Sequence, residues 1–73
     1  MPFKTTVEDI DHMFTYHPPK EDQIPKYNEI REAGKEFAKV ILKHTPGCPD
    51  QTVALRHVRT AVMVANAAIA LEK

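Results

Sequence analysis

The feature that most constrains this chain is an apolar segment near its C-terminal end. From Ala61 to Leu71, ten of eleven residues are apolar, and the exception is Asn66. This length is about half of the ~20 residues that a membrane-spanning helix needs, so we do not expect a membrane span. Apolar side chains at this density cover more than one face of a helix. A single partner helix cannot bury them all, and we therefore expect a symmetric homo-oligomer that assembles through this segment.

Prolines divide the rest of the chain into helical segments. Apart from the one at position 2, they fall in the stretches 18–25 and 46–49. We expect a short first helix that begins after an N-cap at Thr5 or Thr6 and ends before Tyr16. The residues that follow it precede two consecutive prolines, which exclude the α conformation, so this linking segment should be extended.

Two long helices account for the remaining residues. The first of them begins near Asp22, carries Pro25 in its first turn and runs to His44. The second begins after an N-cap at Asp50 and runs to about Leu71. Their similar lengths and short connection predict an antiparallel hairpin in a single all-α domain, residues 1–73. One buried stripe is expected on the first long helix, at Ile24, Tyr27, Ile30, Gly34, Phe37 or Ala38, and Ile41.

Charge and cysteine content exclude several classes of protein. Ten Lys and Arg residues balance ten Asp and Glu residues, so the net charge is zero. A neutral chain is unsuited to coating polymeric nucleic acid or an anionic membrane. The single cysteine, Cys48, cannot form an internal disulfide, which fits a reducing cytoplasm. The segment after Met1 is not apolar, and we expect no secretory signal.

The pattern of histidines and carboxylates predicts neither a metal site nor a catalytic site. Asp9 and His12 are three residues apart, and His44 lies four before Cys48, but no established metal-binding spacing is present. Histidines that are solvated or that cap helix ends are the better interpretation. Nothing near Cys48 in the sequence would activate its thiol. We therefore expect no cofactor and no enzymatic activity.

Aromatic residues before the first proline pair give the first indication of binding. Tyr16 and His17 lie where the following prolines restrict the backbone, so they can present flat faces to a ligand at little entropic cost. Such faces stack on nucleobases. The alternative is structural: Phe14 and Tyr16 would fasten the short helix to the hairpin. The sequence leaves both interpretations open.

Basic residues give the second indication. A ridge along the first long helix is predicted because its cations recur every four residues, at Arg31, Lys35, Lys39 and Lys43. On the second long helix, Arg59 lies two turns before Asn66 and on roughly the same side. A guanidinium suits phosphate or a base edge. The alternatives are a solvated face for the lysines and an interhelical hydrogen bond for Asn66.

The order and spacing of three motifs resemble a family of small phage proteins. The motifs are Phe14-Thr15-Tyr16-His17-Pro18-Pro19, then Tyr27-x-x-Ile30-Arg31, then the segment from Arg59 through Ala70. Together they are similar to the anti-CBASS sponges, whose hairpin domain is shared with anti-Thoeris sponges, over about residues 9 to 71. The resemblance implies helical hairpins that form symmetric oligomers, commonly hexamers. It also implies that they hold cyclic di- or trinucleotides without cleaving them, in the cytoplasm of an infected bacterium.

The resemblance also implies roles for individual residues. Tyr16 and Arg31 would clamp base and phosphate of a cyclic dinucleotide between two subunits, whereas His17 and Lys73 would lie near a separate pocket for cyclic trinucleotides. Val64 departs from the pattern, because an aromatic residue is expected there. Two other functions remain as alternatives, namely a structural or regulatory module that docks a protein through its last helix and a phosphodiesterase that destroys the messenger.

Overall fold

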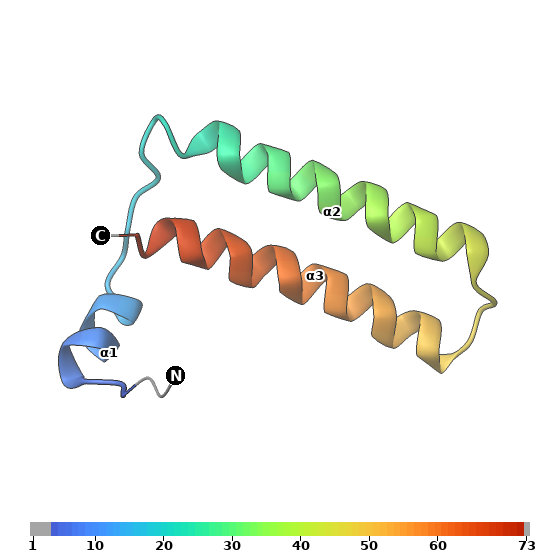
Figure 1. The fold of residues 1–73 in the computed structure, drawn as a ribbon, viewed down its shortest axis with the longest axis horizontal. Helices are drawn as coiled ribbons and strands as arrows, with labels where there is room; N and C mark the ends of the chain where they lie inside the picture. Colours follow the sequence, from blue (N-terminus) through green and yellow to red (C-terminus); the bar gives the residue numbers. More distant parts are fainter. Residues whose placement is uncertain (1–3, 73) are drawn as a thin grey trace.

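The computed structural model describes residues 4–72 and is all-helical over that range. A short helix α1 (Val7–Phe14) precedes two long helices, α2 (Ile24–His44) and α3 (Pro49–Ala70). The long helices run antiparallel and form a hairpin, while α1 lies beside its open end (Figure 1). This confirms the predicted all-helical fold and the order of the helices. Among the residues described, no helix combines the length and the apolar character that crossing a bilayer requires.

Helix α1 begins with a reciprocal pair of hydrogen bonds. The Asp9 backbone N–H donates to Thr6 Oγ1 at 3.1 Å, and the Thr6 backbone N–H donates to Asp9 Oδ2 at 3.0 Å. This capping box satisfies two N–H groups at the helix start. Of the two N-caps that the sequence allowed, Thr6 is therefore the one used.

The starts of the long helices differ from those predicted. Helix α2 begins at Ile24 rather than near Asp22, because residues 21–23 form a turn. In this turn the Gln23 side chain accepts a hydrogen bond from the Lys20 backbone N–H and donates one to the Ile69 carbonyl. Helix α3 begins at Pro49, with Cys48 rather than Asp50 as its N-cap. Proline suits the first helical position, since its ring presets φ and its missing N–H would have no partner there. Asp50 then lies in the first turn, where its negative charge interacts favourably with the positive end of the helix dipole.

The hairpin has an internal seam but no fully buried apolar core. Of the predicted stripe, five residues of α2 are half-buried against α3, whereas Ile24 and Phe37 are 46% and 58% exposed. No apolar residue between positions 4 and 72 is fully buried. The expectation of a buried stripe is thus wrong for the single chain, because two helices cover only one strip of each other's surface. The half-buried members are Tyr27, Ile30, Gly34, Ala38 and Ile41.

Gly34 sets the spacing of the two helices where they approach each other. A Cβ atom built on Gly34 would collide with Cγ2 of Val62 on α3. The absence of a side chain therefore lets Val62 lie against the α2 backbone. Val58, one turn earlier, borders the same position.

Within residues 4–72, helix α1 and the link after it are attached to the hairpin by side-chain hydrogen bonds, and α1 makes no helix–helix contact with α2 or α3. His12 Nε2 donates to the Leu71 carbonyl at 2.8 Å, and His17 Nε2 donates to the His12 carbonyl at 2.7 Å. The Gln23 side chain is 6% exposed and donates to the Ile69 carbonyl at 3.1 Å. We call these three side chains and the two carbonyls on the C-terminal side of α3 the N-terminal clasp.

The clasp replaces the aromatic attachment that the sequence allowed. Phe14 and Tyr16 are 86% and 80% exposed, so they do not fasten α1 to the hairpin of the same chain. Polar side chains attach α1 and its link to the hairpin instead. The last carbonyls of α3 have no N–H partner within the helix, and they accept hydrogen bonds from these side chains. The His12 ring acts there as a helix cap, which is one of the roles expected for the histidines.

We predict that Gly34→Ala destabilises the hairpin by about 1–3 kcal/mol, because the added methyl group must displace Val62 or separate the helices. Thermal unfolding followed by circular dichroism measures the effect.

Gly47→Ala is the matched control. Gly47 has negative φ and open space around its Cβ position, so alanine there should leave stability unchanged or raise it by about 0.4–1 kcal/mol. Equal unfolding temperatures for Gly34→Ala and the unmodified chain would contradict the close approach at the seam.

Candidate functional site

One side of the hairpin carries a groove edged by cations from both long helices. Arg31 and Lys35 border it from α2, and Arg59 borders it from α3. We call this the cationic groove. Its volume is about 270 Å³, slightly below the range of ~300–1,000 Å³ that is usual for small-molecule sites. Its other lining residues are Gly34, Ala38, Leu55, Val58, Val62 and Met63.

The cations of this groove are almost uncompensated. Arg31 has one long contact, in which Nη1 lies 3.5 Å from Asn28 Oδ1. Lys35 and Arg59 have no hydrogen bond or ion pair within residues 4–72. Three basic side chains without carboxylate partners therefore border one groove with an apolar floor. That combination suits an anionic ligand that also carries a flat, apolar part.

Only part of the predicted ridge of cations contributes to the groove. A residue four positions along a helix is rotated by about 40°, so a ridge at this spacing winds slowly around the axis. Arg31 and Lys35 still face the groove, but Lys39 does not line it and instead lies 3.7 Å from Glu36 in an exposed ion pair. Such a pair contributes little to stability. The solvated-face interpretation therefore applies to Lys39.

Sequence reasoning missed the floor of the groove. Leu55 and Met63 lie four residues before and after Arg59 and so share its side of α3. Met63 is 60% exposed, and a flexible thioether adapts to ligands of varied shape. The helical spacing from Arg59 was the signal that could have identified both residues.

Tyr16 and His17 lie apart from the cationic groove within one chain. Tyr16 is on the link between α1 and α2 and lines neither of the hairpin's two grooves. His17 is half-buried, and its Nε2 is engaged in the clasp, with its ring centroid 4.5 Å from that of His12. Lys73 lies outside the described residues. The structure thus groups Arg31, Lys35 and Arg59 and separates Tyr16 and His17 from them.

Asn66 lies on α3 two turns after Arg59. Its Oδ1 atom is buried and has no hydrogen-bond partner within the described part of the chain. The interhelical hydrogen bond that was one interpretation of Asn66 is therefore not formed by this atom. A buried carbonyl without a donor costs about 1–3 kcal/mol.

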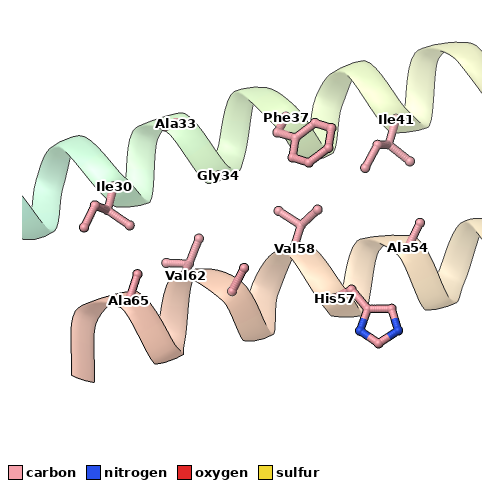
Figure 2. Close-up of a pocket in the computed structure, with 11 residues that line it drawn as sticks. Ile30, Ala33, Gly34, Phe37, Ile41, Ala54, His57, Val58, Val62 and Ala65 are labelled. Atoms are coloured by element: carbon pink, nitrogen blue, oxygen red, sulfur yellow. The ribbon is translucent and has the colours of Figure 1, made fainter. Parts of the chain in front are cut away.

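The other side of the hairpin carries a larger groove of a different character, with a volume of about 560 Å³. We call it the apolar groove. Figure 2 shows Ile30 and Ile41 of α2 pointing toward α3 across it, with the Phe37 ring alongside α2 and the His57 ring turned away from α2. Every lining residue except His57 is apolar or glycine. The α3 side contributes mainly small residues, namely Ala54, Val58, Ala61, Val62 and Ala65.

No group of three or more metal-binding side chains gathers anywhere in residues 4–72. Cys48 is a half-buried free thiol at the start of α3. The two grooves offer cations beside an apolar floor on one side of the hairpin and an apolar surface on the other.

Comparison with models of protein families gives a match that covers most of the chain. The model described as the Acb2/Tad1 hairpin domain matches residues 6–70. The chain belongs to this family. No curated protein and no solved structure matches it.

The Acb2/Tad1 hairpin family is that of the anti-CBASS and anti-Thoeris sponges, so the resemblance seen in the sequence motifs is confirmed. Its members are known as binding proteins rather than enzymes. The match spans α1, α2 and α3 together with the clasp residues up to Ile69. Both grooves therefore lie within the family domain.

We predict that Asn66→Ala raises the stability of this Acb2/Tad1 hairpin by about 1 kcal/mol, because it removes a buried carbonyl that lacks a donor. For a domain of this size the midpoint of thermal unfolding should rise by about 4–8 °C. Asn66→Asp is the comparison, since it keeps the shape but adds a charge and should lower the midpoint. A lower midpoint for Asn66→Ala would show that Oδ1 has a partner in solution.

Proposed function

We propose that this chain is a sponge that binds cyclic oligonucleotide immune messengers and holds them without cleaving them. It acts as a homo-oligomer, with a hexamer favoured, in the cytoplasm of a phage-infected bacterium, and so deprives a CBASS-type effector of its signal. The observation that carries the proposal is the cationic groove in a member of a sponge family.

The charge of the groove suits this ligand class. A cyclic dinucleotide carries two phosphodiesters, and hence about two negative charges, on a compact ring with two flat bases. Arg31, Lys35 and Arg59 have no carboxylate partner to displace before they can meet a phosphate. Met63 and Leu55 supply an apolar surface for a base. Burial of such a ligand strengthens each charge-assisted hydrogen bond.

The exposed area of the chain supports assembly. A compact folded monomer of 8.3 kDa is expected to expose about 4,600 Å². This chain exposes 6306 Å², which is more by about 1,700 Å² and exceeds the ~800 Å² that one partner contributes to a standard interface. The exposed apolar side chains include Val7, Ile10 and Phe14 of α1 and Phe37 of the apolar groove.

Two copies of the chain complete the ligand site in this proposal. Tyr16 is 80% exposed, so its ring is free to stack on a base. It lies on the link before α2, whereas Arg31 lies two turns into that helix. In this proposal, Tyr16 of one copy stacks on a base of the ligand, and Arg31 of another copy contacts its phosphate. A two-fold contact supplies two rings and two guanidinium groups, which matches the near two-fold symmetry of a cyclic dinucleotide.

A second pocket for cyclic trinucleotides is the role proposed for His17 and Lys73. The His17 ring keeps its Nδ1 atom for a ligand, since Nε2 donates within the clasp. Asn66 is the proposed base reader, and its amide must turn to expose the buried oxygen.

Sequestration succeeds through slow release, because affinity differences among related complexes reside mostly in the dissociation rate.

We predict that Arg31→Ala and Tyr16→Ala each weaken the binding of a cyclic dinucleotide by at least about 2 kcal/mol, a roughly 30-fold change in Kd. The first change removes a phosphate contact and the second a stacking surface. Isothermal titration calorimetry measures the affinity, and native mass spectrometry verifies that the oligomer is intact.

Two variants serve as controls for this prediction. Lys39→Ala removes a cation of the same helix that does not line the groove and should leave Kd unchanged. Tyr16→Phe keeps the ring and should retain most of the affinity. Unchanged affinity in both alanine variants would refute the assignment of Tyr16 and Arg31.

The fate of the ligand separates a sponge from a phosphodiesterase. We expect that cyclic nucleotide incubated with the protein and released by denaturation elutes unchanged in chromatography. Linear fragments would identify an enzyme instead.

A protein-docking module is the second candidate function, favoured by the apolar groove on the face opposite the cations. Thermal shift distinguishes it from a sponge. A ligand at 100 times its Kd adds about 2.7 kcal/mol to the stability of the protein that binds it. Cyclic nucleotides should therefore raise the unfolding midpoint of a sponge and leave that of a docking module unchanged.

A further inference from the structure

Helix α1 carries an apolar edge that the described part of the chain leaves largely exposed. Val7, Ile10 and Phe14 occupy positions i, i+3 and i+7 and therefore share one side of the helix. They are 69%, 46% and 86% exposed. The same spacing of anchors is used by helices that bind in the groove of a partner.

The clasp fixes the direction in which this edge points. His12 is rotated by about 140° from Val7 around the helix axis, at ~100° per residue. The side of α1 that bonds the Leu71 carbonyl is thus nearly opposite the apolar edge. As a result, α1 is attached to its own hairpin by its polar side, and the apolar edge lies on the side away from the clasp.

The apolar groove has the dimensions for such a helix. It extends along α3 from Ala54 to Ala65, a rise of about 16 Å, whereas the eight residues of α1 span about 12 Å. Alanines along α3 allow close approach of another helix, and Ile30, Phe37 and Ile41 provide contacts on the α2 side (Figure 2). Phe37 is 58% exposed and is available to such a partner.

We propose that α1 of one copy of this chain docks its edge of Val7, Ile10 and Phe14 into the apolar groove of a second copy. The inference rests on the self-assembly included in the proposed function and identifies the surfaces that assemble. Two such contacts related by a two-fold axis make a reciprocal exchange of helices.

The charge of α1 favours another copy over a membrane as the occupant. Glu8, Asp9 and Asp11 make its polar side acidic, whereas helices that lie on anionic membranes are basic. The groove of the same chain is not available to α1, because the clasp holds it at the open end of the hairpin. The chain also exposes about 1,700 Å² more than a compact monomer of its mass, which is enough area for such an exchange.

Crosslinking between two single-cysteine chains tests the contact directly. Cys48→Ser removes the one native thiol and keeps a good N-cap at the start of α3. In that background, a chain with Ile10→Cys is mixed with a chain of different mass that carries Ala61→Cys, and the mixture is oxidised. We expect a disulfide-linked heterodimer by mass spectrometry. Ile10→Cys mixed with Lys39→Cys is the control and should not crosslink, because Lys39 lies outside the groove.

The remaining outcomes of this experiment overturn the inference in distinct ways. Crosslinking of Ile10→Cys only with itself would show that the α1 helices pair with each other. Crosslinking of Ala61→Cys only with itself would show that the two hairpins pack groove to groove. An assembled chain without any crosslink would reject the docking and leave the proposed function standing, whereas a chain that stays monomeric at all concentrations would reject both.

A pair of substitutions provides an independent measurement. Ile10→Glu places a charge in the middle of the docking edge and should raise the dissociation constant of the assembly at least about ten-fold in sedimentation velocity. Thr5→Glu adds the same charge at an exposed position before α1 and should change it less than about two-fold. Equal effects of the two substitutions would overturn the docking. Circular dichroism verifies that both variants keep their helices.

Discussion

The close approach of two helices at Gly34 is the contact on which the rest of this molecule depends. With Val62 seated against the α2 backbone, the hairpin has one narrow seam and no third layer above or below it. Both of its flanks are therefore surfaces. One flank is edged by cations and the other is apolar, so the same seam borders both the cationic groove and the apolar groove. This division fits the proposed function, in which one flank binds an anion and the other joins further copies of the chain.

The N-terminal clasp solves a different problem, namely how to place a short helix without a core. Isolated helices of eight residues are marginal in water, and α1 obtains little help from apolar packing within its chain. The capping box satisfies its first N–H groups, and His12 fixes its position through a carbonyl that α3 leaves without a partner. Because a carbonyl can only accept, both clasp histidines carry their proton on Nε2. The geometry of the clasp thus also fixes a tautomer.

Local sequence signals predicted the helices well but could not predict contacts between distant residues. The prolines and the spacing of apolar residues located all three helices, and Thr6 was one of two possible caps. Asp50 was a good N-cap by propensity, yet Pro49 at the first helical position takes precedence. The choice between Phe37 and Ala38 depended on the rotation of α2 against α3, which no local pattern contains. Ala38 faces the seam more closely, and Phe37 remains exposed at its edge.

The same limit applies to the candidate site. Arg31 and Arg59 were each identified as cations of interest, but only the hairpin geometry shows that they edge one groove. His12 and Leu71 are 59 residues apart, and no spacing rule relates them. The site has a further property that follows from the seam. Its cations stand on two separate helices, so the width of the groove is set by Gly34, which lines the groove but has no side chain to bind a ligand. In evolution, a change of ligand preference would be open to this fold by widening or narrowing the gap between the helices while every charged residue is kept.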